Sequence, residues 1–264
     1  MSGQELTDAE RELRARQGAG ARYDAESAPH ADLSLARRGT AYFARKLNEL
    51  TDADLDGPSL MPSWSRRHVI AHVGYNARAL THLTEWARTD VETPMYSSPE
   101  VRERQMARGV TLPARALRHL FEHAAVHLNV EWRDLTDEQW DHPVTTAQGR
   151  SIQVRETAWM RAREVWVHAI DLDNDGSFLD FPREFVDRVT ADVFGAWARR
   201  GESVDLTIAL TDRPKQTDAG TTVLGAGGPT VTGAAADVAR WLTGRGARRL
   251  QSSSGALPDI PRWF

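Results

Sequence analysis

Four long stretches of helical periodicity between residues 30 and 175 constrain what this chain can fold into. In each of them apolar residues recur three and four positions apart. Such segments, joined by loops, predict an antiparallel four-helix bundle, whose interior can hold a metal between facing helices. The predicted helices run from about Asp32 to Leu50, from Ser65, a suitable N-cap, to about Arg88, from after Pro113 to about Leu128, and from about Val154 to Leu172.

The pattern changes after Pro182. A helix over about 183–199 is followed by an alternating, strand-like segment over 204–210. Short strands are predicted at 221–224 and 230–232, and a last helix at 234–242. We therefore expect a mainly α protein with an α+β C-terminal part, divided into a polar N-terminal tail (1–25), a four-helix bundle (26–178) and a small C-terminal α/β domain (179–264).

Composition excludes several classes of function. The 264 residues carry a formal net charge of −4, so there is no basic excess for nucleic acid. No apolar run approaches the roughly 20 residues that span a bilayer, and the first twenty residues lack the apolar centre of a signal peptide. We therefore expect a cytoplasmic protein without membrane or nucleic-acid partners. The absence of cysteine excludes disulfides, thiolate zinc fingers and a cysteine nucleophile.

Glu164 and His168 lie four residues apart in the last segment of the predicted bundle and share one face of its helix. This spacing alone also occurs in surface ion pairs. Here, however, the helix is mostly apolar, and Glu164, His168 and Asp171 are confined to an arc of roughly 60°, at about 100° per residue. Polar groups on a mostly buried helix need partners. A metal supplies one, and Asp171 could orient an imidazole or contact a bound substrate.

His72, on the second predicted helix, completes the three-ligand open site of a catalytic zinc ion. His68 stands one turn earlier, and two histidines at that spacing can bind zinc together. The general-base glutamate of a His-Glu-x-x-His motif is absent, so we predict His72 as the ligand and place His68 near the helix start. Asn76, one turn further on, lies on the same face as His72 and is a candidate substrate contact. Without cysteine, thiol chemistry at this metal must use a thiol from outside.

Several longer stretches of the chain carry a recognisable family pattern: 62–72, 76–77, 86–96 and 163–172, together with 236–246 in the C-terminal part. They resemble the mycothiol-dependent maleylpyruvate isomerases of actinobacteria, and the segment 91–96 (Val-Glu-Thr-Pro-Met-Tyr) is the most specific of them. This resemblance implies a DinB-like antiparallel four-helix bundle, followed by a small α/β domain, with zinc held by two histidines and a glutamate. Carried over by motif, those ligands are His72, Glu164 and His168.

The resemblance also implies arginines that bind the carboxylates of a small dicarboxylate substrate. By motif, the one from the C-terminal domain falls at Arg245, with Arg240 as the near alternative. Arg102, in the segment after Tyr96, is the expected second contact, from the bundle. Bidentate, charge-assisted hydrogen bonds make arginine suited to this task. We expect Arg245, Arg102 and Asp171 to serve catalysis, and Asn76 and Arg240 to serve cosubstrate binding.

The function implied by the resemblance is conversion of maleylpyruvate to fumarylpyruvate in gentisate breakdown. A carbon–carbon double bond cannot rotate, so reversible addition of the mycothiol thiolate would lend it single-bond character. Zinc would lower the pKa of that thiol below the roughly 8.5 of free cysteine. Two alternatives stay open: a mycothiol S-transferase acting on another electrophile, and a non-enzymatic zinc-binding regulatory bundle. A monomer or weak homo-oligomer is expected.

Overall fold

The computed structural model describes residues 23–213 and 221–263. The chain divides into two compact units, the first ending at Asn174 and the second starting at Asp175. Nearly all of the predicted tail (1–25) lies outside the described residues. The mainly α fold class with an α+β C-terminal part is confirmed, because long helices fill the first unit and the second combines two helices with a small sheet.

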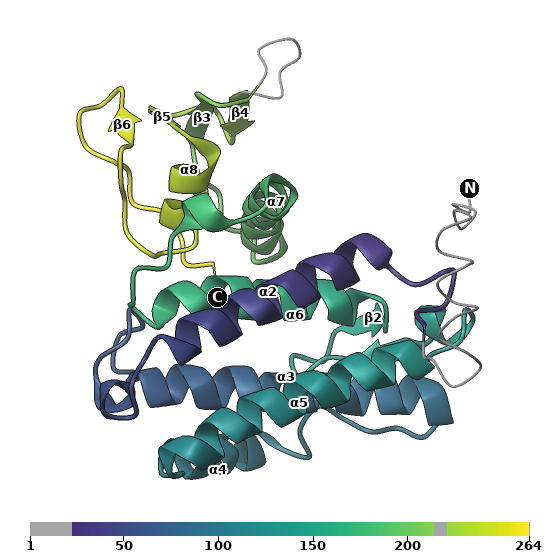
Figure 1. Cartoon of the computed structure of the whole chain (residues 1–264). Coiled ribbons are helices and arrows are strands. Elements are labelled where there is room, and N and C mark those ends of the chain that lie inside the picture. The colour runs from purple at the N-terminus through teal and green to yellow at the C-terminus, as the bar shows by residue number, and fades with distance from the viewer. Residues whose placement is uncertain (1–22, 214–220, 264) are drawn as a thin grey trace, which may run out of the picture. The chain divides into compact units, whose positions relative to one another are not determined.

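The first unit is the predicted antiparallel four-helix bundle (Figure 1). Helix α2 packs against α6, α3 packs against α5, and α3 also contacts α6. Each helix turns an apolar face to the common core, as the periodicity predicted. The four helices are α2 (His30–Asn48), α3 (Arg66–Thr89), α5 (Ala114–Asp134) and α6 (Glu156–Asp171).

Helix α3 has well-defined ends. Ser65 is its N-cap, as predicted, and forms a capping box with His68, whose Nδ1 lies 2.9 Å from the Ser65 hydroxyl and 3.2 Å from its backbone nitrogen. His68 is therefore used to start the helix. At the other end Asp90 adopts the left-handed conformation, with φ of 56°, that often ends helices. These ends fix the register of α3 and therefore the position of its later side chains.

Helix α6 is buried along most of its length and approaches α2 closely. The approach depends on Gly39, where an added Cβ would lie 2.6 Å from Cγ2 of Val165 and 2.7 Å from the indole of Trp166. That indole donates from Nε1 to the backbone oxygen of Leu35 at 2.9 Å. A glycine in mid-helix costs conformational entropy but admits a neighbouring helix at short range.

The structure contains elements of the first unit that the periodicity did not predict. Helix α4 (Pro99–Val110) begins at the N-cap Ser98 and packs on α3, but Gly109 is its one buried residue, so it has little apolar pattern. An antiparallel hairpin pairs β1 (Pro143–Thr145) with β2 (Ser151–Gln153), each only three residues long. Two short 3-10 helices complete the unit, η1 (Ala53–Asp56) and η2 (Gln139–Asp141).

The second unit combines two helices with a four-stranded sheet of order β4-β3-β5-β6. Strand β3 pairs in parallel with β5 and antiparallel with β4, and β6 closes the edge antiparallel to β5. Helices α7 and α8 pack on each other. The elements are η3 (Phe178–Asp180), α7 (Arg183–Arg199), β3 (Leu206–Leu210), β4 (Thr221–Leu224), β5 (Thr230–Gly233), α8 (Ala235–Leu242) and β6 (Gln251–Ser252). All but η3 and β6 were predicted within two residues at each end.

None of the helices within residues 23–213 and 221–263 combines the length and apolar character needed to cross a membrane.

Candidate metal centre

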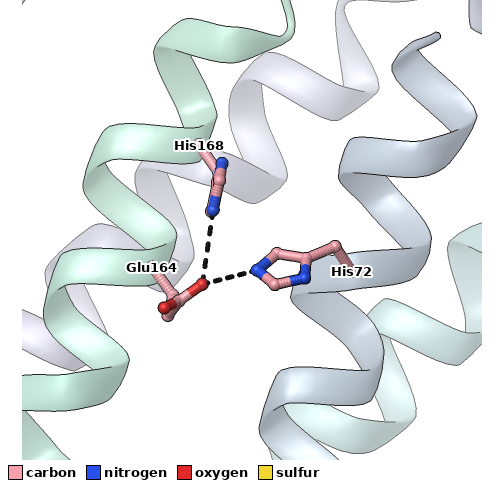
Figure 2. Close-up of side chains that lie close together, drawn as sticks. All are labelled: His72, Glu164 and His168. Carbon is pink, nitrogen blue, oxygen red and sulfur yellow. Dashed lines mark hydrogen bonds and ion pairs between the residues drawn. The ribbon is translucent and has the colours of Figure 1, made fainter. Parts of the chain in front are cut away.

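The structure brings the three predicted metal ligands together in the bundle. His72 comes from α3, and Glu164 and His168 lie one turn apart on α6 (Figure 2). Nε2 of His72 is 2.8 Å from Oε2 of Glu164, and Nε2 of His168 is 3.3 Å from the same oxygen. One donor atom from each residue lies within 4.8 Å of the others. Their side chains are only 14–23% exposed.

Asp171 orients the second imidazole. It is fully buried, and its Oδ2 lies 2.8 Å from Nδ1 of His168, so Nδ1–H donates to the carboxylate and Nε2 faces the cluster. A carboxylate behind a metal-binding histidine fixes both the ring and its tautomer. This contact matches one of the two roles that the sequence suggested for Asp171.

The electrostatics of the cluster are dominated by burial and by mutual hydrogen bonds. Burial raises the pKa of Glu164, but hydrogen bonds to His168 and His72 outweigh it and hold that pKa well below its usual range. Burial lowers the pKa of His168, yet Asp171 and Glu164 raise it to about 9. Burial lowers the pKa of His72 despite Glu164. A proton on His168 must leave before Nε2 can bind a metal ion, so metal uptake is coupled to proton release.

The donor set fits a divalent zinc ion. In a tetrahedral site with bonds of about 2.0–2.2 Å, neighbouring ligand atoms lie roughly 3.3–3.6 Å apart. The His168–Glu164 contact of 3.3 Å has this length, and the His72–Glu164 contact of 2.8 Å is shorter. Two imidazoles and one carboxylate form a common ligand set of catalytic zinc. Among the described residues, no fourth His, Asp or Glu joins the cluster, and the chain has no cysteine. The set therefore leaves one coordination position for water, a thiol or a substrate.

Trp64 forms part of the wall around the first histidine. Its ring lies 5.5 Å from that of His72 and 5.9 Å from that of His68, measured between ring centroids. The rings of His72 and His168 meet edge to face at 4.8 Å. Aromatic contacts of this kind limit how far the His72 ring can rotate, so its Nε2 stays directed at Glu164.

Comparison with known proteins identifies the family. The sequence model of the mycothiol maleylpyruvate isomerase N-terminal domain matches residues 36–173, which include all three cluster residues. The chain belongs to the mycothiol-dependent maleylpyruvate isomerase family. No curated protein gave a significant match.

Two solved structures of such isomerases agree with the family and with the fold. A crystal structure of a mycothiol-dependent maleylpyruvate isomerase has 41% sequence identity and a TM-score of 0.82, covering 89% of this chain and 96% of its own. A histidine-to-alanine mutant of a mycothiol-dependent maleylpyruvate isomerase has 40% identity and a TM-score of 0.82, with the same coverage. The likeness therefore extends beyond the bundle, over nearly the whole length of those isomerases.

Asn76 lies one turn beyond His72 in this member of the isomerase family, and it is 7% exposed. Its Oδ1 accepts a hydrogen bond of 3.0 Å from Nη1 of Arg161, which also donates to the backbone oxygen of Val73 at 2.7 Å. Arg161 stands three residues before Glu164 on α6 and is only 1% exposed. Burial lowers the pKa of Arg161 to about 10, against the charge of Glu164, so the guanidinium remains protonated at neutral pH.

Arg102 and Tyr96 lie on the α4 side of the cluster. The Arg102 guanidinium is 5.8 Å from the centre of the Tyr96 ring, and its charge is one of those that lower the pKa of His72. Burial raises the pKa of Tyr96, and the charge of Glu164 adds to that effect. Arg102 is thus placed where a cation can act on an anion at the cluster. That it binds a substrate carboxylate remains a prediction.

Arg240 and Arg245 belong to the second unit. Arg240 lies in the last turn of α8, and its Nε donates to the backbone oxygen of Arg245 at 2.8 Å, while Arg245 donates from Nη1 to the backbone oxygen of Thr243. The two arginines therefore sit together at one end of α8. Their expected roles toward substrate and cosubstrate remain predictions.

Three residues of the site were missed as functional candidates from the sequence. Arg161 could have been found, because it precedes Glu164 by three positions and so shares its face. Tyr96 lies inside the most specific motif of the family resemblance, and Trp64 lies eight residues before His72. Their contacts depend on how α3, α4 and α6 pack, which periodicity does not reveal.

Proposed function

We propose that this protein catalyses the cis-to-trans isomerisation of maleylpyruvate to fumarylpyruvate, with mycothiol as thiol cosubstrate and zinc as its metal. The observation that carries the proposal is the convergence of His72, Glu164 and His168 within 4.8 Å, in the segment that the family model matches. The chain contains no cysteine, so a thiol nucleophile has to come from outside the chain. The similar structures are named as mycothiol-dependent maleylpyruvate isomerases, which supports this choice of thiol and substrate.

His72, Glu164 and His168 are the proposed zinc ligands. A bound zinc ion would act as a Lewis acid that lowers the pKa of a thiol in its fourth position. Asp171 keeps Nε2 of His168 available by accepting from Nδ1 at 2.8 Å. Two neutral imidazoles and one carboxylate leave a net positive charge at the site, which favours a thiolate over a thiol.

Charged and polar side chains from both units are the proposed binding groups. Arg102 binds one substrate carboxylate from the bundle, and Arg245 binds the other from the second unit, with Arg240 as the alternative. Asn76 contacts the cosubstrate. An arginine gives each carboxylate two parallel, charge-assisted hydrogen bonds, which hold a dianion in a defined orientation.

The proposed reaction is balanced without any other reagent. The thiolate sulfur forms a bond to one alkene carbon, and the electron pair of the double bond moves onto the substrate beside its carbonyl group. Rotation follows about the carbon–carbon bond, which is now single. The carbon–sulfur bond then breaks, the double bond returns in the trans form, and the thiolate is released unchanged.

The cellular location, the oligomeric state and the division of the chain are part of the same proposal. The enzyme works in the cytoplasm on small molecules, as a monomer or weak homo-oligomer. Its functional parts are a polar tail over 1–25, a metal-binding bundle over 26–178 and an α/β domain over 179–264 that supplies an arginine.

The decisive experiment follows maleylpyruvate by absorbance with zinc-loaded protein, with and without mycothiol, and assays free thiol at the end. We expect fumarylpyruvate to form only with mycothiol, and the thiol to be recovered in full. Consumption of the thiol would contradict the isomerase and indicate an S-transferase. Binding of zinc without any affinity for mycothiol would instead indicate a regulatory bundle.

The role of the second-unit arginines has its own test. Arg245→Ala is expected to keep stoichiometric zinc and to lose most turnover, because one carboxylate of the dianion loses its partner. Zinc content by atomic absorption and kcat/KM for maleylpyruvate measure the two effects. Arg240→Ala is the matched comparison on the same stretch of chain. Normal kinetics in Arg245→Ala with loss of turnover in Arg240→Ala would transfer the role to Arg240.

A further inference from the structure

A second pair of polar residues joins α3 to α6 directly beside the candidate metal centre. His72 meets Glu164 across the two helices, and one turn further along α3, at a rise of about 6 Å, Asn76 meets Arg161. The second pair contains a charged guanidinium that is 1% exposed. Because buried charges are costly, this pair calls for a physical explanation.

Arg161 forms no salt bridge among the described residues, although the charge of Glu164 favours its protonated form. Both of its hydrogen bonds come from Nη1, and Nη2 is buried without a partner. The arginine also lines a cavity of about 230 Å³ between α2, α5 and α6, together with Thr40 and Asn129. The wall of that cavity is mainly apolar, with Thr40 and Asn129 among its polar groups. The directed side-chain contact of Arg161 is therefore with Asn76.

The chemistry of arginine fixes how the Asn76 amide is turned. A guanidinium only donates hydrogen bonds, so the amide must present its oxygen to Arg161 and direct its NH₂ group elsewhere. No described residue accepts a hydrogen bond from Nδ2, and that atom is not sealed from solvent. Asn76 thus keeps a free, oriented N–H donor next to the cluster formed by His72, Glu164 and His168.

We propose that Arg161 is a positioning residue, which holds Oδ1 of Asn76 so that Nδ2 donates a hydrogen bond to an uncharged acceptor oxygen of the thiol cosubstrate. The inference rests on the proposed function, because it requires a thiol bound at the metal. A neutral amide suits an uncharged acceptor, whereas the dianionic substrate is matched by arginines. Without Arg161, the amide could turn over and present its oxygen to the ligand, which would repel an acceptor.

Asn76→Asp is the sharpest test, because it keeps the shape and the oxygen that faces Arg161 but replaces the donor with a second acceptor. The measurement is isothermal titration of zinc-loaded protein with mycothiol. We expect the Kd for mycothiol to rise about tenfold or more, because one hydrogen bond is lost and two acceptors then repel each other. The zinc stoichiometry should stay unchanged. Thr84→Val is the control, because Thr84 is another buried polar residue on α3 and its side chain bonds only within its helix.

A double-mutant cycle tests whether Arg161 acts through Asn76. Arg161→Lys keeps the charge but loses the rigid guanidinium plane that directs Nη1 at both Asn76 Oδ1 and Val73 O, and we expect it to weaken mycothiol binding about three- to tenfold. In an Asn76→Ala background the same change should have no further effect, because the residue that it positions is gone. Equal effects in both backgrounds would overturn the positioning role.

The outcomes separate this inference from the proposed function. If the wild-type protein binds mycothiol and Asn76→Asp binds it equally well, the inference is wrong and the proposed function stands. A rise confined to the KM for maleylpyruvate, with an unchanged Kd for mycothiol, also overturns it. If the zinc-loaded wild-type protein does not bind mycothiol, the proposed function itself fails and the inference falls with it.

Discussion

Two helices of the bundle each carry a glutamate and a histidine four residues apart, and only one of the two pairs belongs to a metal-ligand cluster. On α6, Glu164 and His168 approach to 3.3 Å with 14–23% exposure. On α5, His127 and Glu131 approach to 3.5 Å, but the His127 side chain is 49% exposed. The pair on α6 gains a third donor from α3 and a carboxylate behind its histidine. The pair on α5 instead shares its glutamate with Arg88, at 3.2 Å.

The difference shows that helical spacing alone does not define a metal site. Both pairs satisfy the same four-residue rule. What separates them is burial, which makes partners obligatory, and a facing helix that provides the next ligand. Within the described residues, no cluster of three potential ligands forms on α5, although His119, His123 and His127 follow one another along that helix with rings 5.7 and 6.1 Å apart.

The largest expected effect comes from removing His72, and it distinguishes the pair on α6 from the pair on α5. His72→Ala removes the ligand that α3 supplies, so bound zinc and isomerase activity should be lost together, with at least a hundredfold weaker metal affinity. His127→Ala should change neither. Zinc content after dialysis and kcat/KM provide the measurements. Stoichiometric zinc in His72→Ala, or loss of zinc in His127→Ala, would contradict the assignment of the metal site to α3 and α6.

Metal removal should have the next largest effect. A ligand at about 100 times its Kd stabilises the folded state by about 2.7 kcal/mol, so zinc should raise the melting temperature of chelator-treated protein by several degrees. The shift should be absent in His72→Ala and complete in His127→Ala. Differential scanning calorimetry with and without zinc measures it. An equal shift in all three proteins would indicate binding elsewhere.

The buried carboxylate behind His168 should have an intermediate effect. Asp171→Asn keeps the volume but loses the charge that holds the imidazole, so metal affinity should fall about 10–100-fold. Competition with a chromophoric chelator gives the affinity. Arg88→Gln removes the residue that contacts Glu131 in the pair on α5 and is the matched control, with no expected change. Unaltered affinity in Asp171→Asn would mean that the orientation of His168 does not depend on it.

The smallest effect is expected at the exposed pair itself. Exposed ion pairs contribute between zero and about 1 kcal/mol, and surface substitutions cost about 0.5 kcal/mol or less. His127→Gln should therefore change the free energy of unfolding by about 0.5 kcal/mol or less in urea titrations. A loss of several kcal/mol would show that the pair on α5 has a structural role that its exposure does not suggest.

The sequence predicted the long elements well, because their apolar faces are continuous. All four bundle helices and the strands β3 and β5 were placed within a few residues, except that α5 extends to Asp134. Helix α4 was missed because Gly109 is its one buried residue. The hairpin β1–β2 was missed because three-residue strands are too short to show alternation.

The candidate metal centre was predictable in part for a similar reason. Glu164 and His168 share one helix, so their proximity follows from spacing, and His72 was joined to them by motif. The partner of Asn76 was not predictable, because arginine is usually exposed, and only the packing of α3 on α6 shows that Arg161 is buried. Arg240 and Arg245 remain candidates on the strength of the family resemblance.

Gly39 is sensitive to substitution although it is not one of the proposed metal ligands. A methyl group there would collide with Val165 and Trp166, the two residues that directly follow Glu164. Relief of that collision would displace the segment of α6 that carries two proposed zinc ligands. In a library of random substitutions screened for turnover, position 39 should therefore tolerate as little variation as the ligands themselves, and its inactive variants should be those that still accumulate in the cell as folded protein.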